Sequence, residues 1–118
     1  MQGRLLPKID NKYQAHPIGI WEKEFMLAKK IGLNCIEFII DLEGIEKNPI
    51  IANNLSKINS LSKKTNIEVY SICMDFLMEA PIVKYKSSVN YIYKIIENIK
   101  NSKIKYLNLP CVDNSKFR

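Results

Sequence analysis

The chain has 118 residues, of which 47% are hydrophobic and 25% are charged, and this composition is typical of one ordinary globular domain. No apolar run approaches the ~20 residues that a membrane-spanning helix needs. The N-terminus shows no charged region followed by an apolar stretch, so no signal peptide is indicated. We therefore expect a cytoplasmic protein without a membrane helix.

The net charge of +6 raises the question of an anionic partner. The lysines are spread along the chain, and the two arginines, Arg4 and Arg118, lie near its opposite ends. Phosphate-binding surfaces usually concentrate their charge on one face, so the pattern favours solvated helix faces over a nucleic-acid partner. Three cysteines without a C-x-x-C spacing indicate buried reduced thiols and neither a disulfide framework nor a zinc site.

Four stretches have the pattern of strands. The first, MQGRLLPK at residues 1–8, reads as the end of a strand that runs into a loop. Residues 33–40, 67–74 and 104–111 are rich in Ile, Val, Tyr and Cys and are apolar at both alternations, as in a parallel sheet covered on both faces. Cysteines at equal intervals, each followed by an apolar residue and then an acid, align these three runs as one repeating unit. The aligned cysteines are Cys35, Cys73 and Cys111.

Three helical patterns separate these strands, at residues 19–34, 48–66 and 87–103. The second starts with Asn48 as a plausible N-cap and Pro49 at the first helical position. Alternating strands and helices predict an α/β fold with a parallel sheet, either an open doubly wound sheet or a (β/α)8 barrel. No G-x-G-x-x-G or Walker motif is present, which disfavours a nucleotide-binding sheet.

In both architectures ligands bind at the carboxyl ends of the strands, where polar residues concentrate in this chain. These residues predict a site for a hydroxylated or anionic small molecule, with Arg4 available for a bidentate grip on a phosphate or carboxylate. The alternatives are that Glu37 pairs with a lysine across the strand ends, that Asp75 caps a loop and that Arg4 is exposed at a frayed terminus. The polar residues are Gln2, Arg4, Glu37, Asp41, Asp75, Glu79, Asn108 and Asp113.

The residues alone predict no complete active site. His16 is the only histidine, and a lone loop histidine before Pro17 is expected to be a surface residue more often than a general base. No H-E-x-x-H pattern, nucleophile elbow or cysteine–histidine pair stands out, so the catalytic residues are unknown and no metal ligands are assigned.

Several stretches resemble the sugar phosphate isomerase/epimerase family of xylose isomerase-like TIM barrels. They are MQGRLLPK, WEKEFMLAKKIGLNCIEFIID at residues 21–41, the NP that opens the second helix and SICMDFLMEAPI at residues 71–82, with KYLNLPCVD compatible with a fourth strand. The resemblance implies a partial (β/α)8 TIM barrel with strands 1 to 4 and three intervening helices. A complete barrel takes roughly 250 residues, so residues 1–118 would be its N-terminal half.

The resemblance also implies a function. Relatives interconvert sugars or sugar phosphates by proton transfer next to a carbonyl, many with a divalent metal such as Mn²⁺, Mg²⁺ or Zn²⁺. The metal ligands and acid/base glutamates of relatives lie on later strands, so this part of the barrel is expected to be inactive alone and to hold no cofactor. Gln2, Arg4, Glu37 and Asp75 are the substrate contacts that the resemblance implies.

Two alternative functions stay open. A half-barrel has open strand edges, and such edges pair readily with another chain, so a binding or assembly module that associates with itself is one alternative. The other is a nucleic-acid enzyme like endonuclease IV, which belongs to the same superfamily; the net charge favours it slightly, but the expected zinc-binding histidines are absent from the sequence.

Overall fold

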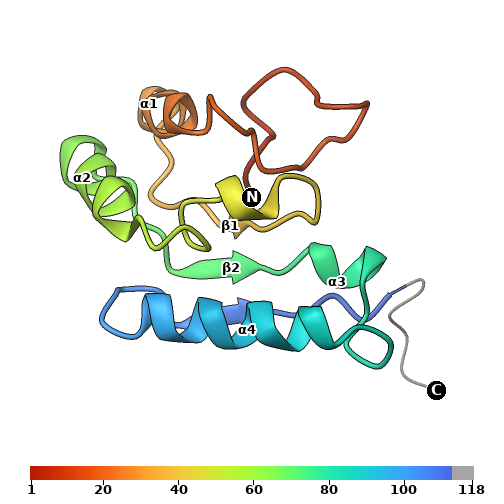
Figure 1. The fold of residues 1–118 in the computed structure, drawn as a ribbon. Coiled ribbons are helices and arrows are strands. Elements are labelled where there is room, and N and C mark those ends of the chain that lie inside the picture. Colours follow the sequence, from red (N-terminus) through yellow and green to blue (C-terminus); the bar gives the residue numbers. More distant parts are fainter. Residues whose placement is uncertain (113–118) are drawn as a thin grey trace.

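The computed structural model of the protein describes residues 1–112. A parallel sheet at its centre has the strand order β1-β2-β3, formed by β1 (Phe38–Ile39), β2 (Ser71–Cys73) and β3 (Tyr106–Asn108) (Figure 1). Ile39 pairs with Cys73, which pairs in turn with Asn108. The strands are short, and the chain before and after each of them carries the functional groups described below.

Residues 1–112 form four α-helices, of which two lie within the predicted helical stretches and a third, α4 (Lys86–Ile99), begins one residue before its predicted stretch. The others are α1 (Glu22–Lys30), α2 (Leu55–Thr65) and α3 (Phe76–Glu79), and a short 3-10 helix, η1 (Ile45–Lys47), precedes α2. The short helix α3, directly after β2, was not predicted.

Helix α2 begins later than the sequence predicts because Asn48 has another role. Its buried side-chain amide donates to the carbonyl of Ile39 at 2.9 Å, and its carbonyl oxygen accepts from the N–H of Ile50 at 3.1 Å. Asn48 therefore ties the segment after η1 to the end of β1 instead of capping a helix.

One face of the sheet packs on the helices. Side chains of alternate strand positions join a single apolar cluster with side chains from α1, α2 and α4, so these helices lie on the same side of the sheet. The other face carries the polar residues that flank the strands. The strand residues and their continuations in the cluster are Phe38, Ile40, Ile72, Met74 and Leu107, packed against Phe25, Ala28, Ile58, Ile95 and Ile99.

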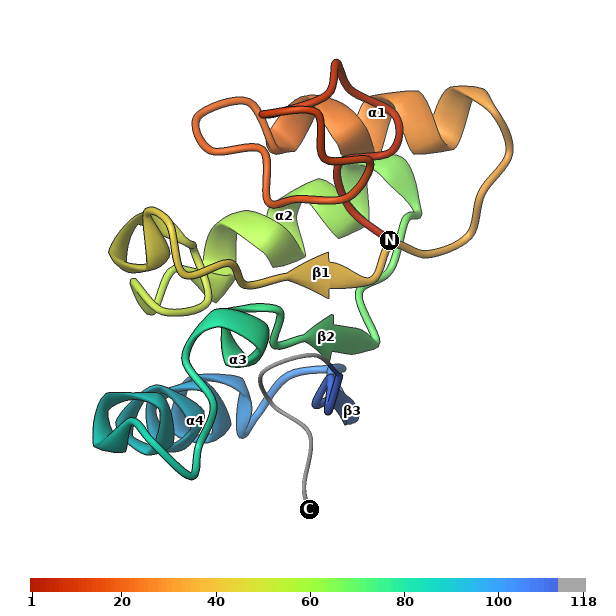
Figure 2. The ribbon, with the colours of Figure 1, turned by 90° about the vertical axis from the view of Figure 1, so that its right-hand side faces the viewer.

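The predicted fold, a partial TIM barrel with four strands and three helices, is wrong. Within residues 1–112 the sheet has three strands, and the chain has four α-helices and no barrel. Residues 2–6 form turns and bends instead of the predicted first strand, since Gly3 has a φ of +82° and breaks the extended backbone. Gln2 nevertheless lies against β1, with the N-terminal loop next to it (Figure 2).

No helix within residues 1–112 combines the length and the apolar character needed to cross a membrane.

Candidate functional site at the carboxyl ends of the strands

The strand register brings two aspartates together. Asp41 follows β1 and Asp75 follows β2, each two residues beyond the pair formed by Ile39 and Cys73. Extending the register by two positions places the two carboxyl groups side by side, and their side chains are hydrogen-bonded to each other. A hydrogen bond between two carboxyl groups requires that they share one proton.

The surroundings of Asp41 and Asp75 raise the pKa of both carboxyl groups. Burial and then the charge of Asp41 raise the pKa of Asp75 to about 6. Burial also raises the pKa of Asp41, although its Oδ2 accepts the backbone N–H of His16 at 2.7 Å, which acts in the opposite direction. A carboxyl group that exchanges its proton near pH 6 is a candidate general acid or base.

One member of the carboxyl pair, Asp41, lines a pocket of about 330 Å³ that is large enough for a small ligand, and Asp75 lies behind it. Most of the remaining wall of the pocket comes from the loop before α1. Lys12 lines the pocket, and its positive charge partly opposes the rise in the pKa of Asp41 and Asp75 that burial causes, which places this charge near the pair. The other charged lining residues are Asp10 and Glu43.

Buried polar contacts fix the N-terminal loop on this pocket. The carboxylate of Glu24, on α1, is buried and accepts the N–H groups of Gly3 at 3.0 Å and Leu5 at 3.3 Å. The side-chain carbonyl of Gln2 accepts from the N–H of Ile39 at 3.0 Å and lies 3.1 Å from Nδ1 of His16. These contacts hold the two ends of the loop to the sheet and to α1.

His16 is buried, contrary to the expectation of a surface residue. Its ring lies 5.4 Å from that of Phe38 between centroids, and burial lowers its pKa to about 4, so the imidazole is neutral at pH 7. Within residues 1–112, Nε2 of His16 and Nε2 of Gln2 are buried without a hydrogen-bond partner. The side chains of Gln2 and His16 therefore pack the loop against the sheet, and we do not assign them contacts with a charged ligand.

The four predicted substrate contacts separate in the structure. Asp75 belongs to the carboxyl pair, and Glu37, half-buried on the same face, accepts a hydrogen bond from the side-chain amide of Asn108. Gln2 is fully buried under the loop. Arg4 is exposed, donates to Oε1 of Gln14 at 2.8 Å and does not line the pocket.

Glu37 and Asp75 influence the same buried thiol. Burial, followed by the charges of nearby carboxylates that include both residues, raises the pKa of Cys73 to about 11, so this cysteine is an inert thiol at neutral pH. Cys35 and Cys111 were expected to be buried and are exposed. Asp113, one of the polar residues noted in the sequence, lies outside the described residues.

No family model, curated protein or solved structure matches this chain.

The divalent metal that the resemblance implies does not fit the residues present. Within residues 1–112, no group of three or more His, Cys, Asp or Glu side chains is placed to hold a metal ion. The two aspartates share a hydrogen bond with each other instead of converging with a third ligand. The chemistry that we propose takes no step through a metal.

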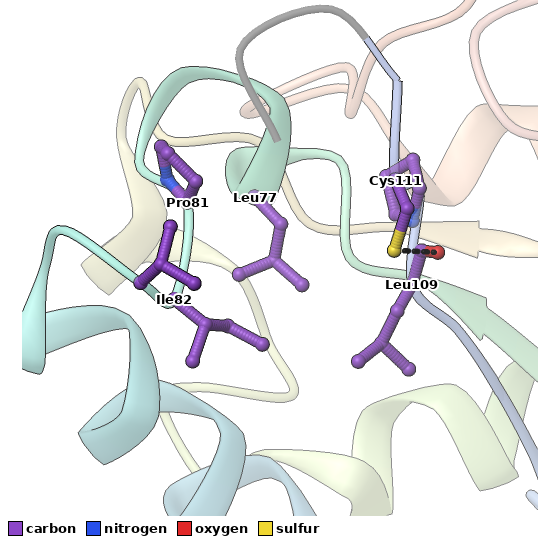
Figure 3. Close-up of a pocket in the computed structure, with 7 residues that line it drawn as sticks. Leu77, Pro81, Ile82, Leu109 and Cys111 are labelled. Carbon is purple, nitrogen blue, oxygen red and sulfur yellow. Dashed lines mark hydrogen bonds between the residues drawn. The ribbon is translucent and has the colours of Figure 1, made fainter. Parts of the chain in front are cut away.

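A second, apolar pocket lies between α3 and the segment after β3. Figure 3 shows Leu77, Pro81 and Ile82 on one side and Leu109 and Cys111 on the other. Its volume of about 10 Å³ leaves no room for a ligand. Of these two pockets, the one beside the carboxyl pair is therefore the one with room for a ligand.

Proposed function

We propose that this chain binds a sugar-type small molecule in the pocket beside Asp41 and Asp75 and moves a proton next to its carbonyl group. This is the reaction of isomerases and epimerases that act on sugars or sugar phosphates. The observation that carries the proposal is a hydrogen-bonded carboxyl pair in which Asp41 lines a 330 Å³ pocket and the pKa of its partner Asp75 is raised to about 6. A cytoplasmic location belongs to the same proposal.

Each charged group has a role in this proposal. Asp75 exchanges the proton with the ligand through Asp41, which lines the pocket, because the pKa of Asp75 lies close to the working pH and either protonation state is accessible. Asp41 holds Asp75 by their hydrogen bond and is itself fixed by the N–H of His16. Lys12 supplies positive charge near the carbonyl oxygen, where negative charge develops when a proton leaves the adjacent carbon.

Hydrogen–deuterium exchange tests the proposal without requiring complete turnover. The protein would be incubated in D2O with a panel of aldoses and ketoses, with and without phosphate groups, and deuterium next to the carbonyl would be followed by NMR. We expect exchange at pH 6 to 7, reduced by about 10²-fold or more in Asp75→Asn. Glu97→Gln on α4 is the control, because Glu97 is an exposed carboxylate outside the pocket.

Exchange that is no faster than in a protein-free sample, for every sugar, would refute the proposal. Equal exchange in the wild-type protein and in Asp75→Asn would also refute it, because the proton would then move without the carboxyl pair.

A second candidate function is assembly of copies through β3. The strand lies at the edge of the sheet, and the side chains of Tyr106 and Leu109 are 64% and 44% exposed. An edge strand offers unpaired N–H and C=O groups to another chain. Sedimentation over a range of concentrations should show a dimer that Leu109→Lys weakens, whereas a monomer at every concentration would exclude this function.

The endonuclease interpretation has less support. Most charged groups that border the pocket are carboxylates, and these would repel the phosphates of a nucleic acid.

A further inference from the structure

We infer that the pocket beside the carboxyl pair is selective for an uncharged polyhydroxylated molecule and disfavours its phosphate esters. The inference rests on the function proposed above and narrows its substrate class from sugars or sugar phosphates to free sugars. Three observations carry it: the charges that line the pocket, the positions of the cations outside it, and the groups available to bind hydroxyls.

The pocket is acidic although the chain as a whole carries a net charge of +6. Three carboxylates line it, those of Asp10, Asp41 and Glu43, against one ammonium group, that of Lys12. Asp75 adds a further negative charge next to Asp41 whenever it is ionised. A phosphate dianion in this pocket would meet more like charges than opposite ones.

Two other basic side chains, Arg4 and His16, do not compensate this negative charge. Arg4, which the sequence suggests as a phosphate ligand, is bonded to Gln14 and does not line the pocket. His16 forms part of the wall, but its burial keeps the imidazole uncharged at pH 7. Among the described residues that line the pocket, Lys12 is the one cation at neutral pH.

The same wall suits a free sugar. Carboxylate oxygens accept hydrogen bonds from hydroxyl groups, and the ammonium group of Lys12 donates to them. The side chains of Ile9, Ile18 and Ile20 offer apolar surface for the carbon-bound hydrogens of a ring or chain. A pocket of about 330 Å³ has room for a monosaccharide.

Paired titrations test this selectivity. Fructose, glucose and their 6-phosphates would be titrated into the protein at pH 7 and low salt, with binding followed by ligand-observed NMR. We expect each free sugar to bind about tenfold or more tightly than its phosphate ester. Glu43→Lys should raise the affinity for the ester by about tenfold relative to the affinity for the free sugar, because it replaces a lining carboxylate with a cation.

Glu97→Lys makes the same charge change on α4, outside the pocket, and should leave both affinities as they are. Tighter binding of the phosphate esters by the wild-type protein would overturn the inference and leave the proposed function standing. Selective binding of the free sugars without deuterium exchange would support the inference about selectivity and overturn the proposed proton-transfer function. An equal gain in Glu43→Lys and Glu97→Lys would overturn the inference, because the effect would come from net charge and not from the pocket.

Discussion

The two edge strands of the sheet, β1 and β3, differ in how their outer backbone groups are hydrogen-bonded. At β1 two residues cover the edge: the N–H of Gln2 donates to the carbonyl of Glu37 at 2.9 Å, and the side-chain carbonyl of Gln2 accepts from the N–H of Ile39 at 3.0 Å. The side-chain amide of Asn48 donates to the carbonyl of Ile39 at 2.9 Å. At β3 no element within residues 1–112 pairs with the outer edge, and Tyr106 is 64% exposed. Gln2 and Asn48 thus take the place of a strand at β1, whereas β3 has no such cover from residues 1–112.

This difference explains how the pocket forms. A full strand beside β1 would keep the chain extended along the sheet, whereas Gln2 satisfies the edge at one point and leaves the chain free to turn at Gly3. The loop that follows brings Lys12 to the carboxyl pair and His16 to the backbone contact with Asp41. The site therefore lies at the covered edge. Its loop is held by buried polar groups, each of which needs a hydrogen-bond partner.

The largest effect on the covered edge is expected from Gly3→Ala. A methyl group at this position would lie 2.5 Å from the backbone oxygen of Ala15, and the φ of +82° is unfavourable for any residue with a Cβ. We expect the free energy of unfolding to fall by about 3 to 4 kcal/mol, measured by urea denaturation.

Gly19→Ala is the matched control for this change. Gly19 has a similar φ of +78° but no heavy atom within 4 Å of the added methyl group, so it should lose only about 1 kcal/mol. Equal losses in the two variants would show that the close approach of Gly3 to Ala15 contributes nothing to the covered edge.

A second prediction concerns the pH dependence of stability near the same edge. The pKa of His16 falls to about 4 in the folded protein, so between pH 4 and 6.5 the unfolded chain binds more protons and the free energy of unfolding rises with pH. The raised pKa of Asp75 acts in the opposite direction, because the folded protein keeps that proton up to about pH 6 and stability falls as pH rises through this range. The two slopes oppose each other in the wild-type protein.

Asp75→Asn removes one of these slopes. The free energy of unfolding of Asp75→Asn should rise by about 3 kcal/mol from pH 4 to pH 6.5, because the slope from His16 is then no longer opposed by Asp75. The wild-type rise should be smaller by about 1 to 2 kcal/mol, because Asp75 opposes it and solvent screens the half-exposed Asp75. Denaturation at several pH values measures both profiles, with Glu97→Gln expected to follow the wild-type curve. Parallel curves for Asp75→Asn and wild type would mean that Asp75 titrates alike in the folded and unfolded chains.

The third prediction removes the covering side chain itself. Gln2→Ala leaves the N–H of Ile39 without the side-chain carbonyl it binds and opens space beside His16, so we expect a loss of about 2 kcal/mol in urea denaturation. Gln14→Ala, whose side chain binds the exposed Arg4, should cost less than about 0.5 kcal/mol. Similar costs for the two glutamines would contradict the role of Gln2 as the cover of β1.

Sequence patterns predicted the helices better than the strand edges. The apolar spacing that predicts α1 and α4 reports on packing, and the residues concerned, such as Phe25, Ile95 and Ile99, do pack in the core. Residues 1–5 look like a strand end because apolar residues alternate with Gln2 and Arg4, but Gly3 takes a left-handed conformation that the alternation does not reveal. The contacts that replace the strand join residues 2–5 to Ile39 and Glu24. These two residues are far away in the sequence, so no local sequence pattern predicts the contacts.

The candidate site was predicted in part, because the repeat was aligned on the wrong residues. Matching Cys35 with Cys73 set Glu37 against Asp75, whereas the sheet pairs Ile39 with Cys73 and so sets Asp41 beside Asp75. The correct signal was the aspartate that follows each strand in IID and CMD. Parallel register depends on how the connecting helices pack, and equal spacing of one residue type does not determine it.

The smallest effect is expected at the open edge, from Tyr106→Thr. Threonine keeps the preference for extended backbone, and the tyrosine ring that is lost is already 64% exposed, so the free energy of unfolding should change by less than about 0.5 kcal/mol. The change should also be independent of protein concentration if β3 has no partner, and larger at high concentration if copies pair through this edge. A loss as large as that of Gln2→Ala at low concentration would show that β3 is stabilised at its edge as β1 is, and the contrast between the two edges would disappear.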